Sequence, residues 1–173
     1  MLLAQSRHET ALGKEWMSVK ISQLHLSDFM LFQQADFQWS PGINVICGTN
    51  STGKTALIKL MYSLHKSYEQ WNSTETKEAA LNRFSEKLCG VFRPDNGKVG
   101  RLVRRKQGSA QMTASMGYEN GTSIDVNFGN RASKISTLAL PKMEHTASPD
   151  HTAVYFPPKE IISATENFTS LYE

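Results

Sequence analysis

The feature that most constrains this chain is the stretch Gly48-Thr49-Asn50-Ser51-Thr52-Gly53-Lys54-Thr55. It has the spacing of a phosphate-binding loop: a glycine, four residues, Gly-Lys, and then Ser or Thr. Glycine lets the backbone turn tightly, and successive backbone N–H groups can then point into one concavity that binds phosphate oxygens. Such a loop requires a strand before it and a helix after it.

The motif also predicts a role for its side chains. The Lys54 ammonium is expected to reach the β- and γ-phosphates and is the predicted catalytic residue, and the Thr55 hydroxyl is expected to ligate Mg²⁺. The N-terminus of the following helix adds its partial positive charge. Asn50 is expected either to cap that helix or to touch a phosphate. The predicted nucleotide-binding residues are Gly48, Thr49, Asn50, Ser51, Thr52, Gly53, Lys54, Thr55 and Ala56.

The residues on both sides of the loop fit this arrangement. The run 43–47 is short, mostly apolar and rich in β-branched residues, so it predicts a buried strand. Residues 55–66 carry apolar side chains at helical spacing, at Leu57, Leu60, Met61 and Leu64. The order of strand, glycine-rich loop and helix is therefore predicted in full.

The rest of the chain reads as a hairpin, a second helix and further β-structure. Alternation predicts a strand over 19–26, with a bulge where the alternation changes phase, and a second over 35–39 paired with it. Residues 68–76 are expected to form a loop and 75–92 a helix that breaks at 93–97. From residue 98 the pattern changes to that of strands. The first predicted strand has Val99, Arg101 and Val103 on one face, and the next ends at 117–118 before a hairpin turn at 119–121. Further strands are predicted at 124–128, 135–140 and 152–156.

Composition limits the class of protein. With 173 residues, 39% of them hydrophobic, the chain can form one globular domain, predicted to begin at residue 17. Residues 1–16 are expected to be an upstream extension or a short helix that packs on the domain. The net charge of +3 permits a nucleic-acid partner without arguing for one. Cys47 and Cys89 are the only cysteines, and no apolar run reaches 18 residues, so we expect a cytoplasmic protein with no membrane partner.

Several stretches together resemble one known family. Leu26-Ser27-Asp28-Phe29-Met30-Leu31-Phe32, then residues 37–46, then the phosphate loop, and finally Val154-Tyr155-Phe156-Pro157-Pro158-Lys159-Glu160 are similar to the N-terminal half of an ABC-type ATPase head of the SMC/RecF-like class, also described as AAA-family ATP-binding proteins. The resemblance implies an α/β fold of the P-loop NTPase type, as an N-terminal lobe flanked by an antiparallel sheet. It also implies that the chain binds ATP and Mg²⁺ and dimerises around nucleotide, in DNA repair, chromosome maintenance or phage defence.

The chain departs from this family at two positions. Relatives usually carry a basic residue between the two aromatics of the upstream motif, where this chain has Met30 between Phe29 and Phe32. Many relatives also have glycine where this chain has Ser51, which is expected to follow the loop at a modest backbone cost.

Other motifs of the family are absent from the sequence. We find no apolar strand ending in an acidic Walker B pair, no Ser-Gly-rich signature motif and no downstream histidine. The domain is therefore expected to be incomplete: a fragment, a truncated product or one part of a split protein, whose partner is a second ATPase head or the missing C-terminal half. An alternative function is a non-hydrolysing nucleotide-binding regulatory module, because hydrolysis depends on groups of this kind. A kinase or GTPase is disfavoured because antiparallel hairpins follow the first helix.

Four further groups of residues are weighed for a functional role against a structural or surface role. The basic residues Arg101, Arg104, Arg105 and Lys106 either contact DNA phosphates or form a solvated face. Phe29 and Phe32 either stack on adenine or pack in the core. His145 and His151, near Glu144 and Asp150, are read as surface histidines because they lack metal-site spacing. Lys159 and Glu160 either lie near the nucleotide or begin a surface helix.

Overall fold

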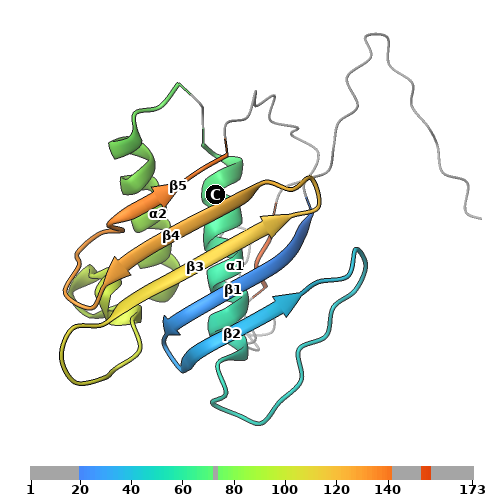
Figure 1. The fold of residues 1–173 in the computed structure, drawn as a ribbon, viewed down its shortest axis with the longest axis horizontal. Coiled ribbons are helices and arrows are strands. Elements are labelled where there is room, and N and C mark those ends of the chain that lie inside the picture. The colour runs from blue at the N-terminus through green and yellow to red at the C-terminus, as the bar shows by residue number, and fades with distance from the viewer. Residues whose placement is uncertain (1–19, 72–73, 142–152, 157–173) are drawn as a thin grey trace, which may run out of the picture.

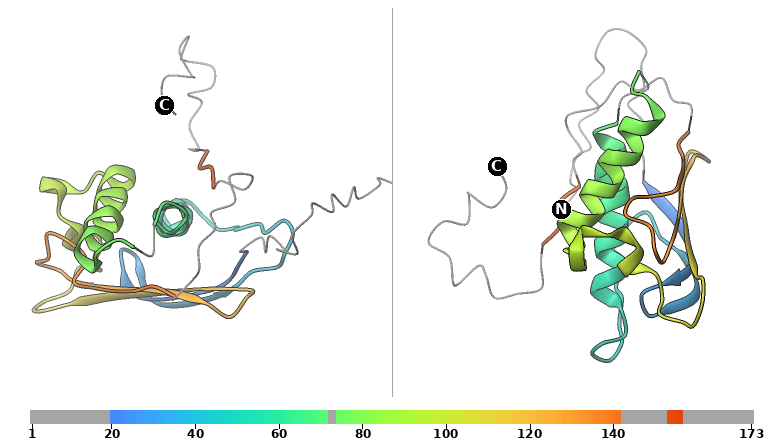
Figure 2. Two further views of the ribbon diagram at one scale, coloured as in Figure 1. Left: turned by 90° about the horizontal axis from the view of Figure 1, so that it is seen from above. Right: turned by 90° about the vertical axis from the view of Figure 1, so that its left-hand side faces the viewer.

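A computed structural model describes residues 20–71, 74–141 and 153–156. In this part of the chain five strands form one antiparallel sheet and two helices cover one of its faces (Figures 1 and 2). The elements are β1 (Ile21–Phe29), β2 (Phe32–Gln38), α1 (Lys54–Glu69), α2 (Lys77–Phe92), the 3₁₀ turns η1 (Asp95–Gly97) and η2 (Val99–Leu102), β3 (Gln111–Tyr118), β4 (Ser123–Gly129) and β5 (Thr137–Ala139). The strand order in the sheet is β2-β1-β3-β4-β5. Both helices come between β2 and β3 in the sequence.

The sheet forms because its strands alternate apolar and polar side chains. In β1, Leu24 and Leu26 are buried while His25 between them is exposed. The apolar side chains of β1, β3 and β4 point to the face that carries the helices, where Leu57, Leu60 and Leu64 of α1 are almost fully buried. The opposite face carries short polar side chains and faces outward. The helices therefore bury one side of an amphipathic sheet, as an α/β layer requires.

Several predicted elements are confirmed. β1 and β2 form an antiparallel hairpin, and the register between β1 and β3 shifts between Ile21 and Gln23, where the sequence predicts a bulge. The turn after β3 is closed by Gly121 N–H donating to the Tyr118 carbonyl at 3.0 Å, with Gly121 at a φ of 79°. β4, β5 and α2 lie where their patterns place them. α2 begins after Thr76, whose side chain accepts from Ala79 N–H.

The predicted buried strand over 43–47 is wrong. These residues belong to no strand, and Ile43 and Val45 are 94% and 78% exposed. An apolar, β-branched run becomes a buried strand only where neighbouring strands pair with it and cover it. No such neighbour lies among the described residues, so the segment runs along the surface into the phosphate loop. The predicted strand over 152–156 is also not formed in its described part, 153–156.

The predicted strand containing Val99, Arg101 and Val103 is wrong as well. This stretch forms η2, which buries Val99 and Leu102 three residues apart and exposes Arg101. Gly100 packs closely against the chain at Asn130: a Cβ added to it would lie 2.7 Å from the Asn130 carbonyl oxygen. That contact is between segments far apart in sequence, and no local pattern predicts it.

The loop expected over 68–76 begins later than predicted, because α1 continues to Glu69 and buries Tyr68. Several other expectations lie outside the described residues. These are the extension 1–16 and the groups at His145, His151, Glu144, Asp150, Lys159 and Glu160. None of the helices in the described part of the chain is long and apolar enough to cross a membrane.

Candidate functional site

The loop Gly48–Thr55 lies at one end of the molecule, where it leads directly into α1 (Figure 1). Gly53 is the residue before the helix and adopts a left-handed conformation with a φ of 91°. A Cβ at this position would lie 2.9 Å from the ring of Phe32, the first residue of β2. Backbone conformation and contact therefore both require glycine here.

The Lys54 side chain folds back over the loop. Its ammonium donates to the carbonyl oxygens of Gly48 at 2.8 Å and Thr49 at 2.5 Å. The Thr52 hydroxyl donates to the same Thr49 carbonyl at 2.9 Å. An ammonium carries three donors, so these carbonyls stabilise the positive charge of Lys54 at the loop. The charge therefore lies close to the backbone that would surround an anion.

The N-terminus of α1 suits a negatively charged ligand. Its first turn carries no acidic side chain, and no side chain caps it. The partial positive charge of the helix is therefore not neutralised from within the helix. The Thr55 side chain is exposed at this end, so its hydroxyl is open to a ligand. The described residues contain no cluster of three or more His, Cys, Asp or Glu that would hold a metal ion by itself.

The structure separates the residues of the upstream aromatic motif. Phe29 is fully buried and packs edge-on against Phe92, so the reading of Phe29 as an adenine-stacking residue is wrong. Phe32 is half-buried and borders the loop at Gly53, a contact that no spacing in the sequence signals. Met30 is 37% exposed at the turn. Asn50 does not cap α1, since Gly53 holds the capping position without a side-chain bond.

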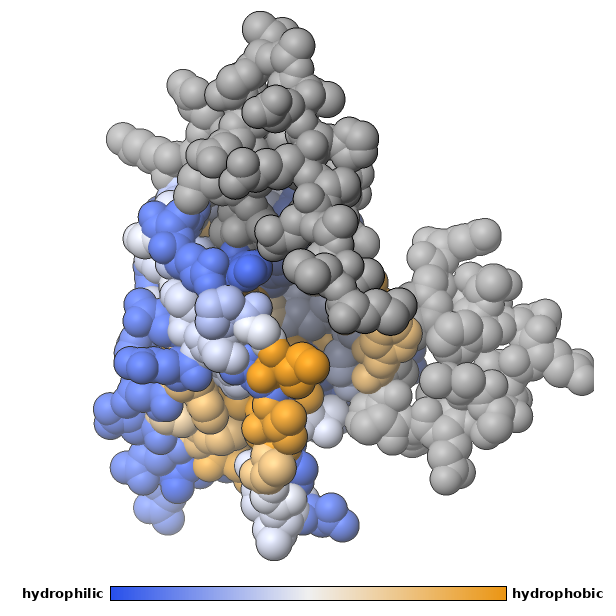
Figure 3. Space-filling view, turned by 90° about the vertical axis from the view of Figure 1, so that its right-hand side faces the viewer, coloured by the Kyte–Doolittle hydropathy of each residue, from blue (hydrophilic) through white to orange (hydrophobic). Residues whose placement is uncertain are grey.

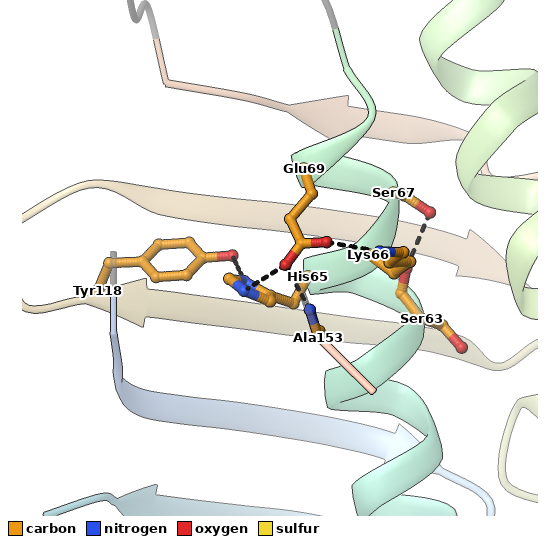
Figure 4. Close-up of polar contacts among 7 residues, drawn as sticks. All are labelled: Ser63, His65, Lys66, Ser67, Glu69, Tyr118 and Ala153. Atoms are coloured by element: carbon orange, nitrogen blue, oxygen red, sulfur yellow. Dashed lines mark hydrogen bonds and ion pairs between the residues drawn. The ribbon is translucent and has the colours of Figure 1, made fainter. Parts of the chain in front are cut away.

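A second polar cluster lies at the other end of α1 (Figure 4). His65 Nε2 lies 3.3 Å from the Glu69 carboxylate, and His65 Nδ1 lies 3.0 Å from the Tyr118 hydroxyl. A carboxylate only accepts, so Nε2 carries the proton and the Tyr118 hydroxyl donates to Nδ1. Burial lowers the pKa of His65 and raises that of Tyr118, which favours this neutral arrangement.

Glu69 also ties a distant segment to α1. Its carboxylate accepts from Lys66 Nζ at 2.9 Å and from the backbone N–H of Ala153 at 2.7 Å. Tyr155, in the same segment, packs its ring on Tyr62 with centroids 5.7 Å apart. The spacing of His65 and Glu69, four residues apart on a helix, was the signal in the sequence for part of this cluster. Its contacts are those of a structural tether.

The outer face of the sheet holds a shallow depression of about 560 Å³. It is lined by short polar side chains together with His25, Asp36 and Asp125. His25 Nδ1 and Asp36 Oδ1 lie 2.6 Å apart, and both side chains are more than half exposed. The depression lies on the face that the helices do not cover, whereas the loop of Gly48–Thr55 leads into α1 on the covered face. It is therefore not part of the loop site.

A known protein family matches more than half of the chain. The family model described as AAA domain matches residues 23–134. The chain is 33% identical over 94 residues to the DNA replication and repair protein RecF of Corynebacterium jeikeium, an alignment covering 51% of this chain and 21% of that protein. It is 34% identical over 88 residues to RecF of Streptococcus equi subsp. zooepidemicus, covering 50% of this chain and 22% of the relative. A shorter alignment of 41 residues with RecF of Renibacterium salmoninarum reaches 46% identity, covering 24% of this chain and 10% of that protein. The chain thus spans about a fifth of the length of the first two relatives.

Proposed function

Because this chain belongs to the AAA domain family, as the N-terminal region of an ABC/SMC/RecF-like P-loop ATPase, we propose that Gly48–Thr55 binds the phosphates of Mg-ATP. One observation carries the proposal: a left-handed Gly53 opens directly into α1, and the Lys54 ammonium lies over the loop carbonyls. The first turn of α1 has no carboxylate that would repel a phosphate. A cation and a free helix N-terminus at one place favour an anion.

Each residue then has a defined task. On binding, Lys54 exchanges the carbonyl oxygens of Gly48 and Thr49 for β- and γ-phosphate oxygens, which carry a full negative charge. The backbone N–H groups from Thr49 to Ala56 donate to the remaining phosphate oxygens. The Thr55 hydroxyl ligates Mg²⁺, and the ion when bound neutralises charge on the phosphates. The donor set present in the chain fits this group of ligands.

The loop is tested by measuring Mg-ATP binding by calorimetry on the wild type and Lys54→Ala. Loss of one charge-assisted contact corresponds to an affinity lower by about tenfold to a hundredfold. Lys77→Ala is the matched control, because Lys77 is exposed at the far end of the molecule, where α2 begins. Indistinguishable affinities of wild type and Lys54→Ala would show that the loop does not hold the phosphates.

We further propose that the chain acts as part of an SMC/RecF-like ATPase in DNA repair, chromosome maintenance or phage defence. The relatives named above are DNA replication and repair proteins. The proposed partner is a second ATPase head or the remaining half of a head, and the exposed run at Ile43 and Val45 supports this because it leads straight into the loop. Sedimentation with and without Mg-ATP separates the two: a nucleotide-dependent dimer of this chain supports a second head.

A second candidate is a non-hydrolysing module that binds ATP as a regulatory or split subunit. The observation that favours it is the lack of an acidic Walker B pair in the sequence, since such groups hold Mg²⁺ and position water for phosphoryl transfer. A single-turnover assay of the chain alone distinguishes it from the first candidate. Mg²⁺-dependent phosphate release that disappears in Lys54→Ala would count against the non-hydrolysing module.

A further inference from the structure

The face of the sheet that the helices leave open presents its side chains in two rows (Figure 2). The strand register aligns a first row across the sheet, in the order Asp36, His25, Ser115, Asp125 and Ala139. A second row, two residues along each strand, consists of Gln34, Ser27, Thr113, Asn127 and Thr137. All ten residues line the depression of about 560 Å³ on this face. We call this depression the polar recess.

Short side chains give the polar recess its shape. None of the ten residues is a lysine, an arginine or a large apolar residue. Leu26, Ala114 and Val126 also line it, and because they are buried from the other face, their backbone forms its floor. Four interstrand steps make the recess roughly 19 Å long, and a step of two residues makes it about 7 Å wide. It therefore has the form of a trough for an extended ligand that lies across the strands.

The polar recess is acidic, although the whole chain carries a net charge of +3. Asp36 and Asp125 stand in one row with His25 and Ser115 between them. Asp36 lies 2.6 Å from His25 Nδ1, and the Asp125 carboxylate accepts from the Ser123 hydroxyl at 3.1 Å. Within the described ranges, neither carboxylate forms an ion pair with a lysine or arginine. The charge of this trough is thus complementary to a cation.

The groups between the two aspartates are acceptors for N–H donors. A carboxylate only accepts, so His25 Nδ1 carries the proton shared with Asp36, and Nε2 of the neutral ring keeps its lone pair. Ser27, Thr113 and Ser115 form no side-chain hydrogen bond within the part of the chain that the structure describes. Their hydroxyl oxygens therefore remain open to a ligand. The recess offers no basic side chain to a phosphate and no aromatic ring to a base.

We propose that the polar recess binds a linear polyamine, with one terminal ammonium on Asp36 and the other on Asp125. Three interstrand steps separate β2 from β4, which places the two aspartates about 14 Å apart. Fully extended spermidine holds its terminal ammonium groups about 11 Å apart, and charge-assisted hydrogen bonds of about 2.8 Å bridge the rest. Its inner ammonium then lies over Ser115 and His25. The recess is separate from Gly48–Thr55, so the proposal does not depend on ATP binding.

The first experiment titrates the full chain with spermidine and with two terminal diamines, by calorimetry at low ionic strength without nucleotide. The eight-carbon diamine has the span of spermidine, whereas the four-carbon diamine carries the same charge as the eight-carbon one but reaches only one of the two aspartates. The eight-carbon diamine is expected to bind about twofold to fivefold tighter than the four-carbon diamine, the effect of one exposed ion pair.

The second experiment repeats the spermidine titration on variants. Asp36→Asn with Asp125→Asn keeps the shape of the recess and should lower the affinity by about threefold to thirtyfold. Ser115→Leu fills the middle of the recess without changing its charge and should also weaken binding. The matched control, Glu78→Gln with Glu86→Gln, removes the same charge from exposed positions of α2 and should bind as the wild type does.

Each outcome decides the proposal. Absence of spermidine binding to the wild type overturns it, and so does equal affinity for the two diamines, because a diffuse attraction to charge does not depend on span. An equal loss in the glutamate control, or no loss in Ser115→Leu, overturns it as well. A lysine-rich peptide that binds more tightly than spermidine assigns the recess to a protein partner and also overturns it. Mg-ATP affinity, expected to be unchanged in the recess variants, separates the polar recess from the phosphate loop, and a parallel loss of it would contradict two separate sites.

Discussion

At the scale of single residues, the phosphate loop shows where this sequence accepts backbone strain. Ser51 has a φ of 63°, in the left-handed region that glycine occupies without cost. Ser51 adopts the backbone conformation that the loop requires, as the sequence predicts. Its Cβ makes this left-handed conformation energetically unfavourable. The left-handed conformation of Ser51 therefore reduces the stability of the folded chain.

We predict that Ser51→Gly stabilises the protein. Removing the left-handed strain gains about 1–2 kcal/mol, and the greater entropy of glycine in the unfolded chain takes back about 0.4–1 kcal/mol. Urea unfolding should therefore show a net gain of up to about 1.6 kcal/mol. Gly53→Ala is the opposite test in the same loop, since its φ of 91° and the Phe32 ring both exclude a Cβ. A loss of stability in Ser51→Gly would contradict the account of strain.

At the scale of elements, α1 carries polar groups at both of its ends and buried apolar side chains between them. Its N-terminus borders the phosphate loop, and its C-terminal turn carries the cluster of His65, Glu69 and Tyr118. Between them, Leu57, Leu60 and Leu64 lock the helix to the sheet. The helix is therefore a rigid link between the loop and the tethered segment 153–156, whose Ala153 N–H binds Glu69.

The cluster predicts a pH dependence of stability. Burial lowers the pKa of His65 from its usual 6.5, despite the opposing charge of Glu69, so below that pH the unfolded chain binds more protons than the folded one. The stability is present above pH 6.5 and is lost as the pH falls below it toward the lowered pKa. Thermal unfolding between pH 7.5 and 5.5 should show a smaller decrease in Tm for His65→Gln than for the wild type. Parallel pH profiles of the two proteins would contradict this role of His65.

At the scale of the whole molecule, one side exposes large apolar side chains that are normally covered by other residues. Figure 3 shows apolar side chains gathered on the side of the molecule where the chain runs from β2 to α1. Ile43 at 94% and Val45 at 78% are the most exposed large apolar side chains of the described residues. Apolar β-branched residues in an extended, unpaired segment form a template for another strand. This side of the fold is where we propose that a partner completes the head.

We predict that this run drives self-association of the isolated chain. Sedimentation at increasing concentration should show less association for Ile43→Ser with Val45→Thr than for the wild type. Because both side chains are exposed, the free energy of unfolding should change by no more than about 0.5 kcal/mol. Leu60→Ala, a fully buried position, is the contrast and should lose about 2–5 kcal/mol. Unchanged association of the double variant would mean that another surface drives it.

Much of the fold follows from patterns within short stretches of sequence. The hairpin of β1 and β2, the turn at Gly121 and both helices were predictable because alternation, turn residues and helical spacing act between near neighbours. The family was recognisable for the same reason, since the phosphate loop and its flanks are contiguous. The roles of the loop residues in binding ATP stay predictions.

The errors share one cause. Local composition predicts a buried strand over 43–47 and a strand with Val99, Arg101 and Val103 on one face, and the structure contradicts both predictions. Burial at residue 43 depends on a neighbouring strand that the described residues do not supply, and η2 packs Gly100 closely against the distant chain at Asn130.

The sequence by itself determined that a glycine-rich loop opens a helix, that amphipathic strands pair in antiparallel hairpins, and which family the chain belongs to. Only the tertiary structure decided that Phe29 is core while Phe32 borders Gly53, and that the stretch from Leu102 to Arg104 is hydrogen-bonded to the end of β1 and the turn after it. The physical reason is range: periodicity and turn chemistry act over a few residues, whereas burial and charge pairing depend on which distant segments meet.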